Sequence, residues 1–264
     1  MKIDLNLNNT KKFNKHFCYG INCDHAPQLL RKDLCEQIKF VHDTLHVKYL
    51  RFHGILSDDM HLISTLKDIF PLPGSERFVT YDFTQVGEVY DNVLECGFTP
   101  FVELSFMPKL LAKDTSKRIL FTYGGNSGMP KDDALWQDFI KQFVSFLIDR
   151  YGKQEIEKWP FEVWNEPDLV VFFGDTKEDY FHLYELTARA IKEVDKNIKV
   201  GGPATSGCKW AEEFIKFTKD NNVPLDFIST HQYASDSVTV LYTSGENMSP
   251  FANRQLLDSV SDGE

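Results

Sequence analysis

The sequence of 264 residues contains no run of about 18 apolar residues, so it predicts no helix that crosses a membrane. Its first residues, MKIDLNLNNTKK, lack the apolar core of a secretory signal peptide. The cysteines do not have the spacing of metal ligands, and Cys18 and Cys23 are better interpreted as buried free thiols than as a disulfide. Together these absences predict a cytoplasmic protein.

Positive charge is also scarce. Lys and Arg number 29 against 39 Asp and Glu, which gives a formal net charge of −10 at pH 7. A surface this acidic disfavours nucleic acid and anionic membranes as partners and favours a neutral or cationic small ligand. The sequence has neither a cluster of cysteines nor a phosphate-binding glycine loop, so it predicts no metal and no cofactor.

Short apolar segments typical of strands alternate along the chain with amphipathic helical patterns. The strand-like segments fall at 17–22, 47–55, 98–106, 161–164, 199–203 and 227–233. Helical patterns occupy 34–45, 86–94, 136–147, 183–194 and 210–218, and Gly97 supplies the left-handed residue that commonly follows a helix. Such alternation predicts a parallel sheet with right-handed crossovers.

No internal repeat, low-complexity tract or domain boundary interrupts this alternation, so residues 1–264 are expected to form a single domain. Eight strand–helix units at the spacing of the later ones, roughly 30–40 residues each, would need a longer chain. The prediction is therefore an α/β fold of the (β/α)8 TIM-barrel type that is incomplete, with about six of the eight units present. The segment 254–260 is interpreted as the start of the sixth helix.

The most informative segment is 161–167, which reads Phe-Glu-Val-Trp-Asn-Glu-Pro. It starts as an apolar strand, and Pro167 prevents further ladder hydrogen bonding after Asn165 and Glu166. (β/α) barrels place their chemistry at the C-terminal ends of their strands, so polar side chains at several strand ends should meet on one face. The other predicted strands also end in such residues, namely Arg51, His53, Glu103, His231 and Tyr233.

Five segments, taken in order, resemble glycoside hydrolase family 39, which holds retaining β-xylosidases and α-L-iduronidases on a (β/α)8 barrel. They are YLRFHGILSDDM (49–60), PFVELSFMP (100–108), WPFEVWNEPDL (159–169), KVGGPAT (199–205) and FISTHQY (227–233). The resemblance implies double displacement, in which one carboxylic acid protonates the glycosidic oxygen and a carboxylate about 5–5.5 Å away attacks the anomeric carbon. It implies neither a metal nor a cofactor.

By this resemblance Glu166 is the acid/base, and Asn165 hydrogen-bonds the 2-hydroxyl of the sugar. A solvated loop glutamate and a turn-capping asparagine are the plainer alternatives for these two residues. His53 and His231 resemble the family's histidines at the sugar-binding subsite, although a histidine on an apolar strand is often a core residue. Tyr233 shares a strand face with His231 and is interpreted as a further sugar contact in preference to plain packing.

Three other charged residues on these strands are expected to be structural. Arg51 lies on the strand face of His53, and an unpaired buried charge is costly, so Arg51 is expected to pair with Glu162 or Glu103. Glu162 lies four residues before Glu166 and is too deep to reach a sugar. Geometry alone would allow Glu103 as a second catalytic carboxylate, a role that the family pattern does not give it.

The sequence departs from the family pattern in two places. The nucleophile belongs to a Thr-Glu-Trp-like segment on the seventh strand, and nothing in 234–264 resembles it, since Glu246 lies in a turn-like context. The nucleophile is therefore expected beyond residue 264, the chain is expected to be inactive alone, and its open barrel edges are expected to promote self-association. Phe173 stands where the family commonly has tryptophan, and it is expected to stack on sugar with less area.

The sequence thus predicts a retaining, exo-acting β-xylosidase that trims small β-1,4-linked xylooligosaccharides from the non-reducing end in xylan degradation. An α-L-iduronidase, or another retaining member of the clan, is the nearest alternative and would need a cationic clamp for the uronate carboxylate. A non-catalytic carbohydrate-binding barrel is the alternative from another class. It is disfavoured because a retained binding module should keep a closed barrel.

Overall fold

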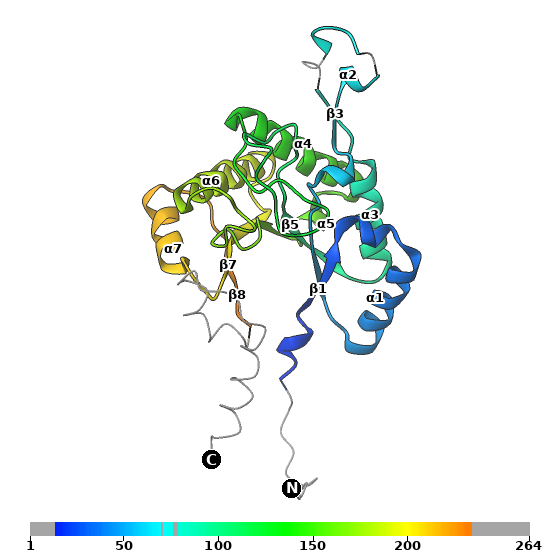
Figure 1. Cartoon of the computed structure of the whole chain (residues 1–264). Coiled ribbons are helices and arrows are strands. Elements are labelled where there is room, and N and C mark those ends of the chain that lie inside the picture. Colours follow the sequence, from blue (N-terminus) through cyan, green and yellow to red (C-terminus); the bar gives the residue numbers. More distant parts are fainter. Residues whose placement is uncertain (1–13, 70, 76–78, 234–264) are drawn as a thin grey trace, which may run out of the picture.

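Six parallel strands form the main sheet of the protein. A computed structural model describes residues 14–69, 71–75 and 79–233 (Figure 1). The strands pair in the order β1-β2-β5-β6-β7-β8, and every pairing in this sheet is parallel. Their bounds are β1 (Gly20–His25), β2 (Tyr49–His53), β5 (Thr99–Leu104), β6 (Pro160–Val163), β7 (Lys199–Ser206) and β8 (Phe227–His231).

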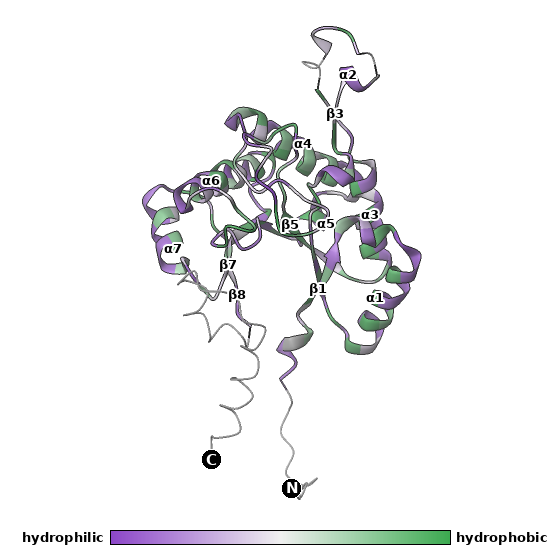
Figure 2. Ribbon diagram, in the orientation of Figure 1, coloured by the Kyte–Doolittle hydropathy of each residue, from purple (hydrophilic) through white to green (hydrophobic). Residues whose placement is uncertain are grey.

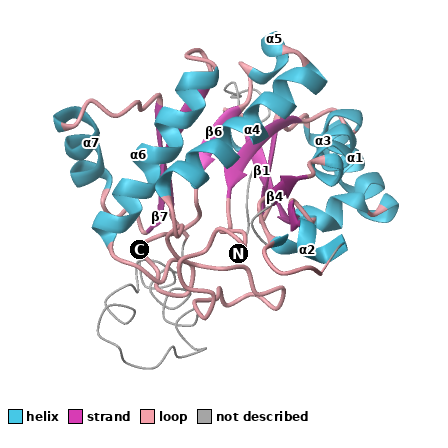
Figure 3. Cartoon of the chain, turned by 90° about the horizontal axis from the view of Figure 1, so that it is seen from above, coloured by secondary structure: helices cyan, strands magenta, loops and turns pink. Residues whose placement is uncertain are grey.

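Helices connect these strands and lie around the outside of the sheet, as the view from above shows (Figure 3). They are α1 (Lys32–Leu45), α3 (Thr84–Glu95), α4 (Asp133–Tyr151), α5 (Lys153–Ile156), α6 (Lys177–Val194) and α7 (Ala211–Asp220). Each of the longer helices carries both hydrophilic and hydrophobic residues (Figure 2). Six parallel strands with alternating helices confirm the predicted incomplete (β/α)8 barrel.

Alternation along β2 shows how the sheet separates its two faces. Leu50 and Phe52 point toward the helices and are buried, whereas Tyr49, Arg51 and His53 point to the other side. On the helix side, the apolar stripes of α4 and α6 pack together, and the Trp136 indole of α4 donates to the Thr187 hydroxyl of α6 at 2.9 Å. The inner face of the half-barrel is therefore left for polar side chains.

The structure differs from the predicted elements at two places in the N-terminal half of the chain. The segment expected as a strand from residue 17 begins with a 3-10 turn, η1 (His16–Cys18), and β1 starts only at Gly20. A small antiparallel pair, β3 (Ile63–Thr65) and β4 (Val79–Tyr81), with α2 (Leu66–Ile69) between them, was not predicted. It projects away from the main sheet (Figure 1), and its strands of three residues are too short to show a period.

Gly97 follows α3 with φ of +93°, which confirms the predicted left-handed residue. Of the thiols, Cys96 is buried, but Cys18 and Cys23 are only partly buried, so the expected burial of these two is incomplete. None of the described helices is long and apolar enough to cross a membrane.

Within the described residues, β1 pairs only with β2 and β8 only with β7, so both strands present a free edge. We expect the 264-residue chain to self-associate, with a light-scattering mass above 30.5 kDa that rises with concentration. Ile228 on β8 is 40 % exposed, and Ile228→Lys should lower that mass because a charge on an edge strand opposes strand addition. The matched control is Val170→Lys, at an exposed loop position. A concentration-independent monomer would contradict this expectation.

Candidate active site

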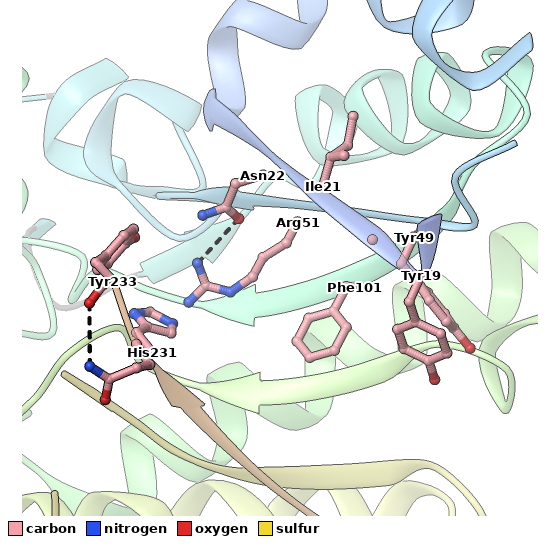
Figure 4. Close-up of a pocket in the computed structure, with 10 residues that line it drawn as sticks. Tyr19, Ile21, Asn22, Tyr49, Arg51, Phe101, His231 and Tyr233 are labelled. Carbon is pink, nitrogen blue, oxygen red and sulfur yellow. Dashed lines mark hydrogen bonds between the residues drawn. The ribbon is translucent and has the colours of Figure 1, made fainter. Parts of the chain in front are cut away.

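The inner face of the half-barrel holds a cavity of about 420 Å³ between β1 and β8 (Figure 4). Strand register aligns its residues, because Asn22 of β1 lies opposite Arg51 of β2, which lies opposite Phe101 of β5. His231 of β8 closes the other side of the cavity. The full lining is Tyr19, Gly20, Ile21, Asn22, Tyr49, Arg51, Phe101, His231, Gln232 and Tyr233.

Arg51 lies at the centre of a buried network of charges. Its Nε donates to Glu162 Oε2 at 2.7 Å, and its Nη2 lies 2.7 Å from Glu103 Oε2. The side chains of Glu103 and Glu162 are 0 % and 2 % exposed, so neither carboxylate reaches solvent. The predicted pairing of Arg51 with Glu162 or Glu103 is confirmed for both, and both carboxylates are structural in this arrangement.

Glu103 also orients His53. The His53 Nδ1 lies 2.8 Å from Glu103 Oε2, and the Ser105 hydroxyl donates to the other oxygen of Glu103. Burial raises the pKa of Glu103, but the charges of Arg51 and His53 outweigh burial, so the pKa of Glu103 lies below its ordinary value. Burial likewise lowers the pKa of His53, but the Glu103 carboxylate outweighs it and the pKa of His53 is raised.

Asn165 is fixed by the same arginine. Arg51 Nη2 donates to Asn165 Oδ1 at 3.0 Å, and a guanidinium can only donate, so this contact identifies the amide oxygen. Asn165 is 2 % exposed, which leaves its amide little freedom to turn. The amide nitrogen Nδ2 is therefore the end of the Asn165 side chain that does not contact Arg51.

Glu166 follows at the end of β6, where the backbone changes direction. Trp164 and Glu166 have φ of 74° and 45°, a region that non-glycine residues seldom adopt and that is enriched at functional sites. The Glu166 amide donates to Ala204 O at 2.9 Å, and Glu166 Oε1 lies 2.9 Å from His231 Nδ1. The Glu166 side chain is 12 % exposed, and its carboxyl is held by His231 of β8. His231 lines the 420 Å³ cavity, whereas Glu166, Asn165 and His53 are not among the lining residues.

The remaining predicted sugar contacts have contrasting environments. Tyr233 follows β8, lines the cavity and is 58 % exposed, which is compatible with a contact to a ligand. Phe173 is 1 % exposed and packs edge-on against Trp164 and Tyr180 at 5.4 and 5.9 Å between ring centroids. The expectation that Phe173 stacks on sugar is corrected, because a ring buried in the core presents no face to a ligand.

Sequence reasoning missed three residues at this site. Asn22 accepts from Arg51 Nη1 at 3.4 Å, Ser105 donates to Glu103, and the ring of Phe121 lies 5.7 Å from that of His53. Asn22 follows the period-two alternation of β1, so its signal was present, whereas Ser105 comes directly after the last residue of β5. Phe121 lies in a loop and left no such signal. The expectations for 234–264, including Glu246 and the helix at 254–260, concern residues outside the described part of the chain.

Comparisons with a family model, with curated proteins and with solved structures all point to the same family of glycoside hydrolases. The model of the family "Glycosyl hydrolases family 39" matches residues 1–261. A β-xylosidase of Caldicellulosiruptor saccharolyticus is 41% identical over 250 residues, which covers 94% of this chain and 49% of that protein. A β-xylosidase of Geobacillus stearothermophilus is 38% identical over 236 residues, which covers 88% of this chain and 45% of that protein.

The crystal structure of a monomeric β-xylosidase from Caulobacter crescentus CB15 superposes with a TM-score of 0.77 at 37% identity, over 84% of this chain and 43% of that one. The chain spans about half the length of the curated relatives it matches.

The His53–Glu103 pair predicts a pH dependence of stability. Because the pKa of His53 is raised in the folded state, His53 stabilises the fold fully at pH values below its pKa in the unfolded chain, about 6.5. This contribution is lost as the pH rises through the pKa of His53 in the folded state. Because the pKa of Glu103 is lowered in the folded state, Glu103 stabilises the fold at pH values above its pKa in the unfolded chain, about 4.3. This contribution is lost as the pH falls through the pKa of Glu103 in the folded state. The free energy of unfolding in urea should therefore decline above pH 6.5 more steeply in the wild type than in His53→Gln.

The control for this measurement is His182→Gln. His182 Nε2 lies close to the Asp133 carboxylate, and both side chains are about half exposed. Solvent screens such a pair, so in the control the free energy of unfolding should decline above pH 6.5 as steeply as in the wild type. Equal slopes for wild type and His53→Gln would contradict the assignment.

Proposed function

The chain belongs to glycosyl hydrolases family 39, and on this premise we propose that it acts as a retaining β-xylosidase on β-1,4-linked xylooligosaccharides. The observation that supports the proposal best is the pair at the end of β6, where Asn165 is oriented by Arg51 and Glu166 contacts His231. We propose further that residues 1–264 belong to one barrel domain that removes xylose from the non-reducing end.

In the proposed first step, Glu166 donates its proton to the glycosidic oxygen while a second carboxylate attacks the anomeric carbon. The departing sugar leaves as an alcohol, and xylose is left bound to that carboxylate. The hydrogen bond between His231 and Glu166 would hold the carboxyl at the strand end during this transfer. In the second step the Glu166 carboxylate takes a proton from water, whose oxygen attacks the anomeric carbon; the bond to the second carboxylate breaks, and xylose is released.

Substrate hydroxyls would be held by polar atoms that the buried network has already oriented. Asn165 offers Nδ2 to the 2-hydroxyl oxygen, since its Oδ1 is taken by Arg51. His53 offers Nε2, since its Nδ1 faces Glu103. His231 and Tyr233 bound the other side of the cavity and complete the proposed sugar subsite.

The nucleophile is proposed to come from outside residues 14–233. Among the described residues, the other carboxylates of the inner face, Glu103 and Glu162, are buried and paired with Arg51, so neither can attack a sugar. Double displacement needs a second carboxylate about 5–5.5 Å from Glu166. Since no segment of 234–264 resembles the family's nucleophile segment either, the 264-residue chain is proposed to lack turnover by itself.

A neutral sugar fits the described cavity better than a uronate does. Arg51 is the cation in the part of the lining that the structure describes, and Glu103 and Glu162 already neutralise it. A uronate carboxylate would need an unpaired cationic partner. Two curated relatives named β-xylosidase, at 41% and 38% identity, support xylose as the sugar.

Azide tests this proposal on the chain as it is, because an external anion can replace a missing nucleophile. With an aryl β-D-xyloside alone we expect no release of phenol above background. With azide, attack at the anomeric carbon should form α-xylosyl azide and release the phenol. For a poorly acidic phenol, Glu166→Gln should slow that release about 100-fold or more, because the leaving oxygen then receives no proton.

Glu178→Gln on the exposed surface of α6 is the matched control and should behave as the wild type. Turnover without azide that Glu166→Gln abolishes would show a nucleophile within this chain. Absence of release with azide, together with absence of xylose binding, would contradict the proposed function.

A further inference from the structure

The turn that carries Glu166 contacts the end of β7 as well as β8. Beyond β6 the backbone has left-handed φ at Trp164 and Glu166, and on β7 it has left-handed φ at Ala204. The pairing of β7 with β8 also shifts register between Pro203 and Thr205. Residues other than glycine keep such a conformation only where their surroundings fix it. Contacts beyond the strand ladder must therefore hold the Glu166 turn against β7.

Asp168 makes such a contact. Its Oδ1 accepts from the Ser206 amide at 2.8 Å, and its Oδ2 accepts from Lys209 Nζ at 3.3 Å. The Asp168 side chain is 1 % exposed. A buried carboxylate is costly unless it is paired, and here each oxygen has a donor. One side chain of the turn is thus joined to the last residue of β7 and to the segment that follows β7.

The partner of Asp168 on β7 is also the neighbour of His231. Ser206 lies opposite His231 in the pairing of β7 with β8. His231 Nδ1 in turn lies 2.9 Å from Glu166 Oε1. The chain from Glu166 to Asp168 therefore closes a ring of contacts with two paired strand residues, Ser206 and His231. Because of this ring, a displacement of Asp168 would move Glu166 relative to His231.

The backbone of the turn supplies little else that could hold it on β7. Pro167 has no amide hydrogen, and the Leu169 amide donates to Glu166 O within the turn at 3.0 Å. The Glu166 amide itself donates to Ala204 O at 2.9 Å. Among the residues that the structure describes, this amide and the Asp168 carboxylate are therefore the hydrogen-bonded links from the turn to β7.

We infer that Asp168 is a positioning residue for the proposed acid/base: through Ser206 and Lys209 it fixes the turn in which Glu166 meets His231. The inference rests on the proposed function and adds to it a residue that does not touch substrate. With 1 % of its side chain exposed, Asp168 acts on the reaction only through the position of Glu166.

Hydrogen exchange at single amides of the 264-residue chain, read by mass spectrometry, tests the positioning without any substrate. In Asp168→Ala the Glu166 amide should exchange at least about tenfold faster relative to the Thr99 amide, which is hydrogen-bonded at the start of β5. The ratio removes any loss of global stability, because global unfolding exposes both amides together. Asp168→Asn keeps an acceptor for the Ser206 amide, and Lys209→Met removes only the partner of Oδ2, so each should change the ratio roughly threefold or less.

Asp175→Ala is the matched control. Asp175 likewise accepts from a backbone amide, that of Met129 at 2.8 Å, and pairs with a lysine, Lys117, but it holds a different loop. It should leave the exchange ratio unchanged. A ratio that is unchanged in Asp168→Ala, or that changes equally in Asp175→Ala, would overturn the inference whether or not the chain acts on sugars.

Azide-dependent release of two phenols adds a chemical readout. For a poorly acidic phenol, Asp168→Ala should slow release about tenfold, because a displaced Glu166 no longer protonates the leaving oxygen efficiently. For dinitrophenol, which leaves without a proton, release should stay within about twofold of the wild type. Equal slowing of both phenols would overturn the positioning role and leave the proposed function standing. Failure of the wild type to release either phenol or to bind xylose would contradict the proposed function, and the exchange ratio would still decide the role of Asp168.

Discussion

The arrangement of the inner face depends on one buried cation. Arg51 reaches Glu162 on β6, Glu103 on β5 and Asn165 just beyond β6, so one side chain links three neighbouring strands. Desolvation makes such a network a poor source of net stability, but removal of one partner leaves an uncompensated buried charge. The charges therefore act as a constraint: β2, β5 and β6 must keep their register for every member to be paired.

That constraint also decides which atoms face a ligand. Because Glu103 takes Nδ1 of His53 and Arg51 takes Oδ1 of Asn165, the atoms left over are His53 Nε2 and Asn165 Nδ2. Fixed polar atoms need no reorganisation when substrate binds, which is how polar sites stabilise developing charge most effectively. The proposed acid/base, Glu166, is held separately by His231 on β8 and by Ala204 on β7. The two halves of the proposed site are thus oriented by different strands.

The sequence predicted those parts of the fold that depend on local pattern. Strands with apolar alternation and helices with an apolar stripe were found, and the pairing of Arg51 followed from the cost of a buried charge. The hairpin β3–β4 was missed because three residues cannot show a period. The prediction for Phe173 was wrong because burial depends on Trp164 and Tyr180, which only the fold brings to it. The link from Asp168 to the end of β7 joins segments that only the fold brings together, and it left no signal in the sequence.

The most direct test of this account is a double-mutant cycle on Arg51 and Glu162, with the free energy of unfolding measured in urea. Arg51→Met should cost about 3–5 kcal/mol, because it leaves Glu162 buried without its partner, and Glu162→Gln should cost less, because Arg51 keeps Glu103. The double variant should cost less than the sum of the two by more than about 1 kcal/mol. Costs that add within about 0.5 kcal/mol would show that the pair is not coupled and would contradict the central role of Arg51.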